Sequence, residues 1–245
     1  MENQKKLDRL MRSQSFEPPV VTLLEVQDYA RTMADIENVV VVVSDIANSN
    51  SRIFAGGFAE VIGLKDYHSE DSIWETKILS LMTAEEQNYK FIAELRFFHF
   101  LRHLPKAKRK DYYLLSKLRF TLADGKTVNV LHRMHYLFDR ACDSVRYAIC
   151  VYGPLAFDMT GKSYAVNSLS GISEELTSSA NNSVLSRRER QVLALIDKGF
   201  RSSDISDSLK ISIHTVNRHR QEILTKLQVK NSHEACRIAK TMGMI

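Results

Sequence analysis

The stretch "ISIHTVNRHRQEILTKL", residues 211–227, combines two histidines and two arginines with regularly spaced apolar residues. On a helix of about 3.6 residues per turn, the apolar residues fall on one stripe. This stripe consists of Ile213, Val216, Ile223, Leu224 and Leu227. His214 and His219 are separated by about 140° around such a helix, so they cannot easily bind the same metal ion. The stretch therefore predicts a helix over residues 213–227, with one face in a core and the other face polar.

The residues on both sides of this stretch predict three further short helices. Each of the four helices begins near a residue whose side chain can accept hydrogen bonds from the free N–H groups of a helix start. These N-cap candidates are Ser186, Ser202 or Ser203, Ser212 and Asn231. Glu189 and Glu234 complete capping boxes, and Gly199 suits the left-handed residue that follows a helix. Four short helices, two of them joined by a three-residue turn, are typical of a helix-turn-helix domain.

Basic residues are concentrated in the same part of the chain. Residues 185–245 contain 12 Lys and Arg against 6 Asp and Glu, a net charge of +6. Because the whole chain carries +5, residues 1–184 carry about −1. A positive excess confined to one segment favours a polyanionic partner for that segment alone.

The segment "LSRRERQVLALIDKGFRSSDISDSLKISIHTVNRHRQEILTKLQVKNSHEACRIAKTMGMI" (185–245) resembles a LuxR/NarL-type helix-turn-helix domain over its full length. The resemblance rests on "RRERQVL", "KGF", "DIS", "HTV" and the final Asn and Glu-Ala, all at fixed spacing. The family implies a sequence-specific, DNA-binding transcription regulator whose third helix enters the major groove. The partners that it implies are double-stranded DNA, a second copy in a homodimer and the transcription machinery, with no membrane.

The resemblance also implies roles for individual residues. Asn217, Arg218 and Gln221 are expected to contact bases, because amide and guanidinium groups match the hydrogen-bonding edges in the major groove. The residues expected to contact the DNA backbone are His214, Thr215, Lys226 and Lys230. Arg220 lies toward the apolar stripe, where its stem can pack while its charged end reaches the rim.

Three positions depart from the family pattern. Arg187 stands where proline is common, Ser206 where alanine is frequent, and Gln228 where glycine is frequent. A left-handed Gln228 would be strained by about 1 kcal/mol, which concerns the helix cap and not the fold.

Residues 22–157 predict an α+β domain with an antiparallel sheet. Helical spacing is clear in 22–38 and 83–104, and "VVVVVSD" (39–45) predicts a buried strand. Three segments with alternating apolar residues follow, the first two joined by the Asp-Gly turn of "ADGK" (123–126). Short connections between such segments predict an antiparallel meander.

This order of elements is similar to that of a PAS domain. The segment "RIFAGGFAEVIGL" (52–64) resembles the start of many PAS domains at Phe58 and Gly63. The resemblance implies a role in sensing a signal or contacting a partner. No cofactor is expected to be required, and binding of an unidentified small ligand is compatible with such a domain. The alternatives for this domain are binding of a small, autoinducer-like ligand and a purely dimerising role.

Other classes of protein fit less well. A receiver domain needs a parallel sheet, and although Asp45 follows a strand, the later meander is antiparallel. The acyl-homoserine-lactone domain of other regulators uses a set of Trp, Tyr and Asp, whereas Trp74 is the chain's single tryptophan. The sequence contains no P-loop, no G-x-S-x-G and no H-E-x-x-H, so neither an enzyme nor catalytic residues are expected.

A metal site is not expected. His99 and His103 are four residues apart on a predicted helix, but no third ligand has a recognisable spacing. His132 is interpreted as a core residue with satisfied hydrogen bonds. The cysteines form no C-x-x-C motif, which favours reduced thiols in a cytoplasmic protein. They are Cys142, Cys150 and Cys236.

The chain is thus expected to divide into four parts. These are a flexible N-terminus (1–21), a PAS-like domain (22–157), a Ser/Asn-rich linker (158–183) and a helix-turn-helix domain (184–245). Apolar runs such as residues 39–43 are far shorter than the about 20 residues of a membrane span. No signal peptide is evident, so a cytoplasmic location is expected.

Overall fold

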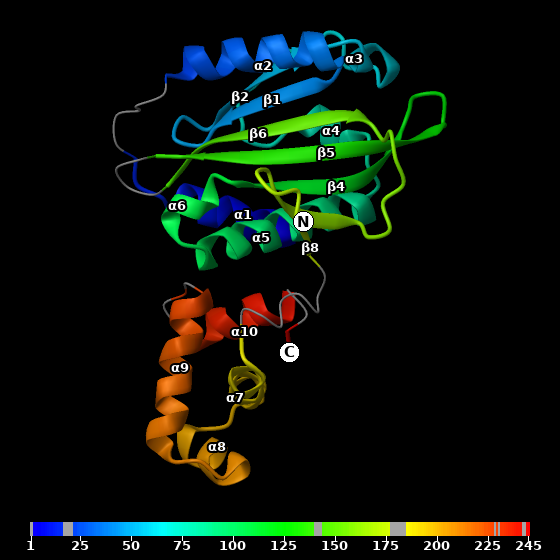
Figure 1. The fold of residues 1–245 in the computed structure, drawn as a ribbon. Coiled ribbons are helices and arrows are strands. Elements are labelled where there is room, and N and C mark those ends of the chain that lie inside the picture. Colours follow the sequence, from blue (N-terminus) through cyan, green and yellow to red (C-terminus); the bar gives the residue numbers. More distant parts are fainter. Residues whose placement is uncertain are drawn as a thin grey trace. The chain divides into compact units, whose positions relative to one another are not determined.

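A computed structural model describes residues 2–16, 22–139, 144–176, 185–227, 229, 231–241 and 244–245. The chain divides into two compact units, which Figure 1 shows in colours that follow the sequence. One unit is Met1–Leu95 with Pro105–Glu175, called the sheet domain below. The other is Arg96–Leu104 with Leu176–Ile245, and its last four helices are called the helical domain.

Within the described residues, the sheet domain contains one antiparallel sheet of eight strands, in the order β3-β2-β1-β6-β5-β4-β7-β8. The strands are β1 (Val40–Asp45), β2 (Asn50–Ala55), β3 (Ser69–Glu70), β4 (Tyr112–Thr121), β5 (Thr127–Phe138), β6 (Val145–Pro154), β7 (Ser163–Asn167) and β8 (Ser173–Glu175). The predicted meander corresponds to β4, β5 and β6. The sheet places β1 directly beside β6, although about 100 residues separate them in the chain.

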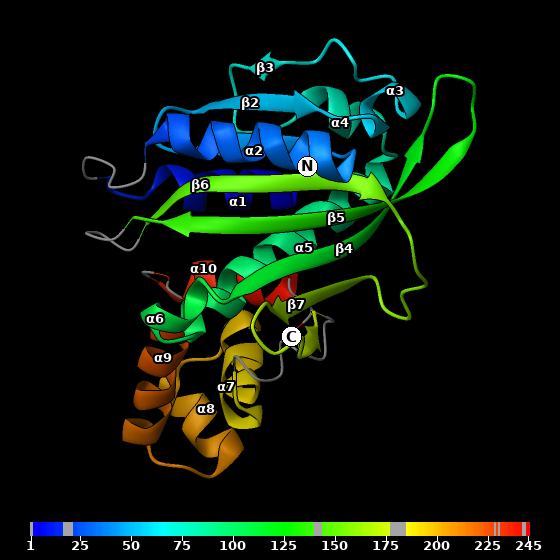
Figure 2. The ribbon, with the colours of Figure 1, turned by 45° about the horizontal axis from the view of Figure 1, so that its top comes forward.

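Helices cover both faces of this sheet. They are α1 (Glu2–Arg12), α2 (Leu23–Glu37), α3 (Phe58–Val61), α4 (Thr76–Ser80), α5 (Ala84–His103) and α6 (Lys106–Arg109). Figures 1 and 2 show α2 on one face and both α1 and α5 on the opposite face. The face toward α1 and α5 is called the inner face below.

The run of valines explains how one strand serves both faces. Every residue of β1 is buried, as predicted for a strand covered on two sides. Val41 and Val43 pack against α2 in one apolar cluster, and the residues between them point to the inner face because side chains alternate along a strand. Gly56, after β2, allows a close approach, since a Cβ atom there would lie 2.0 Å from the carbonyl oxygen of Ala34.

The N-terminus corrects one expectation. Residues 1–21 were predicted to be flexible, yet Glu2–Arg12 form α1; residues 17–21 lie outside the described part. Leu7 and Met11 are 2% and 3% exposed, so the helix is stabilised by burial of one face. A helix of this length is only marginally stable in isolation. Its many charged residues make the apolar stripe hard to recognise in the sequence, and packing of that stripe against the sheet stabilises the helix.

The segment 158–183 is also more ordered than its composition predicts. Instead of a linker throughout, it contains β7 and β8, which extend the sheet beyond β4. These two strands need few apolar residues, because the neighbouring strands supply their backbone hydrogen bonds. Ala165 and Val166 are sufficient here, at 0% and 8% exposed. Residues 177–183 lie outside the described part of the chain.

The helical domain consists of α7 (Arg187–Asp197), α8 (Ser202–Leu209), α9 (Ile213–Leu227) and α10 (Ser232–Thr241). The four helices enclose one apolar cluster that includes Leu193, Ile205, Val216 and Ile223. The predicted fold class is confirmed: an antiparallel sheet with helices, followed by a four-helix domain. Among the described residues, no helix is both long enough and apolar enough to cross a membrane.

His99 on α5 provides a test of the fold by pH. Its side chain is 1% exposed, and burial, together with the charges of His103 and Arg102, lowers the pKa of His99 to about 4 from an ordinary value of 6.5. Between these two pH values the unfolded chain binds a proton that the folded chain does not. The free energy of unfolding should therefore fall as the pH drops through this window, by up to about 1.4 kcal/mol per pH unit.

Urea denaturation of the full chain at several pH values measures this slope. The variant His99→Gln, which cannot titrate, should show a shallower slope between pH 6.5 and 4. Equal slopes for the two proteins would show that His99 is protonated as readily in the folded chain as in the unfolded one.

Candidate nucleic-acid interface

The helical domain begins at the predicted capping box. Ser186 Oγ accepts a hydrogen bond from the Glu189 N–H (3.2 Å), and Glu189 Oε2 accepts one from the Ser186 N–H (2.7 Å). Gly199 follows α7 with a φ of +86°, the left-handed conformation expected there. Both ends of α7 are therefore determined by residues that the sequence identifies.

The start of α8 differs in detail from the prediction. The N-cap residue is Arg201, not Ser202 or Ser203, and its N–H donates to Asp204 Oδ2 at 3.0 Å. The hydroxyl of Ser202 instead donates to Asn217 of α9. Asp204 thus accepts the hydrogen bond at the start of α8, and the hydroxyl of Ser202 can connect α8 to α9.

The turn between α8 and α9 has one left-handed residue and is held by two hydrogen bonds. Lys210 adopts the left-handed conformation with a φ of 52°. Ser206 Oγ donates to the carbonyl oxygen of Ile211 (2.6 Å), and Arg188 donates to that of Leu209 (2.5 Å). Ser206, which replaces an alanine that is frequent in the family pattern, therefore contributes a hydrogen bond that alanine could not make. These contacts set the direction in which α9 leaves the turn.

The core-facing side of α9 contains most of the predicted apolar stripe. Val216, Ile223 and Leu227 are at most 1% exposed, but Ile213 is 50% exposed and does not belong to the core. Ile213 is the first residue of the helix, one turn before the buried cluster begins at Val216.

Arg220 lies on the core side of α9, as predicted. Its guanidinium group donates to Ser202 Oγ (3.4 Å) and to Ser232 Oγ (3.3 Å). These hydroxyls belong to the first residues of α8 and α10, so Arg220 connects three helices. This arginine bridges helices of the domain, whereas the side chain of Arg218 is largely exposed.

The three residues expected to contact bases share the exposed side of α9. Asn217, Arg218 and Gln221 are all exposed, and the side chain of Arg218 is 64% exposed. The Oδ1 atom of Asn217 accepts the hydrogen bond from Ser202 at 2.9 Å, which orients its amide NH₂ group. Arg218 Nε lies 3.6 Å from Glu222, an exposed pair that contributes little to stability. The geometry thus presents two amide groups and one guanidinium group on one side of the helix.

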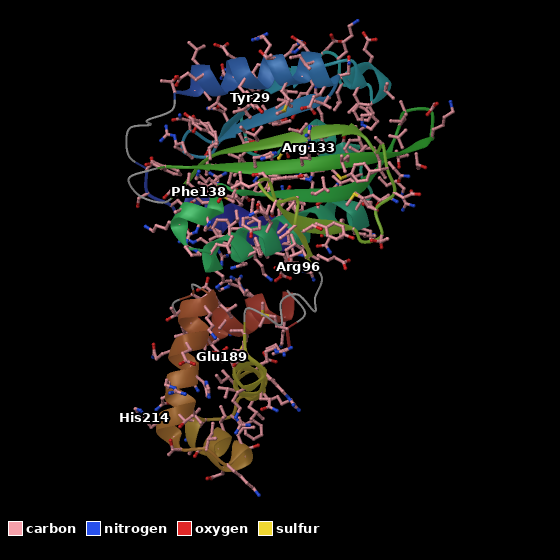
Figure 3. The ribbon with its side chains drawn as sticks, viewed as in Figure 1. Tyr29, Arg96, Arg133, Phe138, Glu189 and His214 are labelled. Atoms are coloured by element: carbon pink, nitrogen blue, oxygen red, sulfur yellow. The ribbon has the colours of Figure 1, made fainter. Side chains whose placement is uncertain are left out.

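Two of the residues expected to contact the DNA backbone, His214 and Thr215, lie at the start of α9. His214 is exposed, and Figure 3 shows it on the side of α9 that faces away from α7. Thr215 is half-buried, and its hydroxyl lies 2.9 Å from Ser212 Oγ, which also accepts from the Thr215 N–H at 3.1 Å. Ser212 therefore caps the helix, as predicted. Lys230, and Gln228 with its expected strain, lie outside the described residues.

Lys226 has a role that the sequence did not predict. Its ammonium group lies 2.7 and 2.8 Å from the two carboxylate oxygens of Glu189, whose side chain is only 2% exposed. Burial acts to raise the pKa of Glu189, but the hydrogen bonds from Lys226 and Ser186 outweigh it and lower that pKa. Figure 3 shows Glu189 between α7 and α9. Lys226 is thus committed to an ion pair that joins these helices.

Comparison with known proteins agrees with this geometry. Residues 183–239 match the family model described as "Bacterial regulatory proteins, luxR family". The helical domain therefore belongs to the LuxR family of bacterial regulatory proteins.

The chain is also similar to the "Oxygen regulatory protein NreC" of Staphylococcus epidermidis, with 38% identity over 167 residues. This match covers 67% of the chain but 62% of the relative, so the chain spans less than two thirds of that protein's length. Among solved structures, a phage VqmA–DPO complex is similar at a TM-score of 0.34 and 15% identity, covering 90% of both chains. A PAS domain from Colwellia psychrerythraea is similar at 0.35 and 9% identity, covering 53% of this chain and 97% of that one.

The Lys226 ion pair makes a prediction about stability. Lys226→Ala leaves the Glu189 carboxylate buried without its charged partner, so we expect the free energy of unfolding to fall by about 1–3 kcal/mol. Chemical denaturation monitored by circular dichroism measures the change. Lys198→Ala, which removes the same charge from the exposed C-cap position after α7, is the control and should change stability by less than about 0.5 kcal/mol. Equal effects of the two substitutions would contradict the assignment.

Proposed function

We propose that this protein is a sequence-specific, DNA-binding transcription regulator in which α9 reads the major groove. The observation that carries the proposal is the exposed set Asn217, Arg218 and Gln221 on a helix whose opposite face is fixed in a core. Amide and guanidinium groups form two hydrogen bonds each with adenine and guanine edges, respectively. A rigid helix that presents them side by side suits base recognition.

The charge of the helical domain supports the same function. Residues 185–245 carry +6, although several of these cations, such as Lys226 and Lys240, are paired with acidic residues of the domain. Arg218 retains a largely exposed guanidinium group. His214 and Thr215, at the first turn of α9, are proposed to contact the DNA backbone beside it, and Lys230 is proposed for the same role from sequence alone. Lys226 is proposed to contribute mainly through its ion pair.

The sheet domain is proposed to sense a signal or a partner and to mediate dimerisation. The two domains would then divide the work: the sheet domain responds, and the helical domain binds an operator together with that of a second copy. A paired operator contact gains affinity because the second half-site is bound intramolecularly. The rival function of the helical domain is binding of a protein partner in place of DNA.

Arg218 provides the test of base recognition. Binding sites selected from a random library of duplex DNA are used in a fluorescence-anisotropy assay with the full chain. Arg218→Ala should weaken binding to the selected site by about 1–3 kcal/mol and relax the choice of base at one position. The affinity of the unchanged protein should also fall steeply with salt concentration.

Arg187→Ala is the matched control, because Arg187 is an exposed arginine on α7 and its removal changes the net charge equally. It should leave the base preference intact. If no duplex is enriched by selection, or if both variants keep the same preference and affinity as the original protein, α9 is not a DNA-reading helix and the protein-partner function is favoured.

Dimerisation is tested by light scattering of the full chain at micromolar concentration, alone and with a selected duplex. We expect a mass of two chains bound per duplex, that is, twice the 28.0 kDa of one chain. A single chain in both conditions would contradict the dimer while leaving DNA recognition by α9 intact.

A further inference from the structure

The inner face of the sheet carries a group of buried polar side chains that DNA binding does not use. Lys90 and Glu94 lie on α5, and Glu75 lies immediately before α4; the side chains are 2–3% exposed. Lys90 Nζ is 2.6 Å from Glu94 Oε1 and 3.5 Å from Glu75 Oε2. Two carboxylates therefore face one ammonium group in an environment without solvent.

His132 of β5 points into the same region. It is 0% exposed and stacks on Tyr152 with ring centroids 4.8 Å apart. Among the described residues, neither of its ring nitrogens has a hydrogen-bond partner. This corrects the interpretation of His132 as a satisfied core histidine. A buried imidazole without hydrogen-bond partners costs free energy, so the two unpartnered nitrogen atoms of His132 require an explanation.

Cys150 of β6 completes the cluster. Met134, two residues along β5 from His132, lies opposite Cys150, so the register brings the histidine and the thiol to one side of the sheet. One potential ligand atom from each of Glu94, His132 and Cys150 lies within 4.8 Å of the other two. A carboxylate, an imidazole and a thiolate are the ligand types that Zn²⁺ and related borderline-soft cations take in proteins.

The charges favour a divalent cation. With the thiol deprotonated on coordination and its proton released to water, the two carboxylates and the thiolate exceed the Lys90 ammonium by two negative charges. A divalent cation neutralises this excess, and buried charge is costly unless it is paired. Because Lys90 has Glu75 as a second partner, Glu94 can turn an oxygen toward a cation while the ammonium stays paired.

The volume of the adjoining cavity also favours an ion over an organic ligand. A cavity of about 30 Å³ is lined by Glu75, Lys90, Glu94 and Cys150, together with Leu7 and Met11 of α1; His132 is not among its lining residues. Pockets for small organic ligands are larger, about 300–1,000 Å³. The cavity suits an ion with one water molecule.

We propose that Glu94, His132 and Cys150 form a binding site for a borderline-soft divalent cation, with zinc as the reference ion and water in the fourth position. Sequence inspection could not assemble this site, because the three ligands come from α5, β5 and β6. The site is independent of DNA recognition, so either proposal can fail while the other holds.

The test uses the full chain, stripped of metal with a chelator and titrated with Co²⁺. We expect one equivalent to bind, with the near-ultraviolet charge-transfer absorption of a sulfur–cobalt bond, and Zn²⁺ to displace it. Cys150→Ser should abolish that absorption, whereas Cys236→Ser, which alters a buried thiol of the helical domain, should retain it. His132→Gln should weaken Co²⁺ binding by at least about tenfold, and His99→Gln, at another buried histidine, should not.

A second measurement needs no variant. X-ray absorption at the zinc edge of the zinc-loaded protein should show one sulfur ligand at about 2.3 Å, with nitrogen and oxygen ligands completing the shell. No cobalt–sulfur absorption at one equivalent, absorption that survives Cys150→Ser, or a zinc shell without sulfur would each overturn the proposal.

Discussion

The candidate interface depends on one buried carboxylate, that of Glu189. It closes the capping box at the start of α7 and binds the ammonium group of Lys226 on α9. A single side chain therefore satisfies a helix terminus and fixes the distance between two helices. Since α9 is also held by Arg220 and by the turn after α8, its exposed residues are presented on a rigid support. Rigid presentation lowers the entropy cost of recognition, because few side chains must be ordered on binding.

In the sheet domain, the arrangement of side chains depends on their alternation between the two faces along each strand. Residues of β1 and β6 at alternate positions pack against α2, and those between them point to the inner face, where Lys90, His132 and Cys150 gather. The contact between the sheet and α2 is apolar, so close packing is sufficient to stabilise it. The inner region contains several ionisable groups, so its stability depends on how completely these groups neutralise one another. The two faces of one sheet thus differ in composition, with apolar packing against α2 on one side and buried ionisable groups on the other.

Local patterns predicted a large part of this molecule. The capping box of Ser186 and Glu189, Gly199 at the end of α7, the valine strand and the Asp-Gly hairpin all appear where the sequence predicted them, because each depends on residues close together in the chain. The errors have a common cause. Residues 1–21 and 158–183 appeared mobile or linking from their composition, yet α1, β7 and β8 obtain their stability from a sheet that composition does not reveal.

The sequence by itself determined the class of the helical domain and the division of α9 into two faces, because helix periodicity and caps are local properties. Only the tertiary structure decided which charged residues of α9 are engaged: Lys226 is bound to Glu189 and Arg220 to two serines, while Arg218 remains largely exposed. It also decided that Glu94, His132 and Cys150 meet. These pairings join residues that are 12 to 56 positions apart, and such distances in the chain are bridged only by strand register and helix packing.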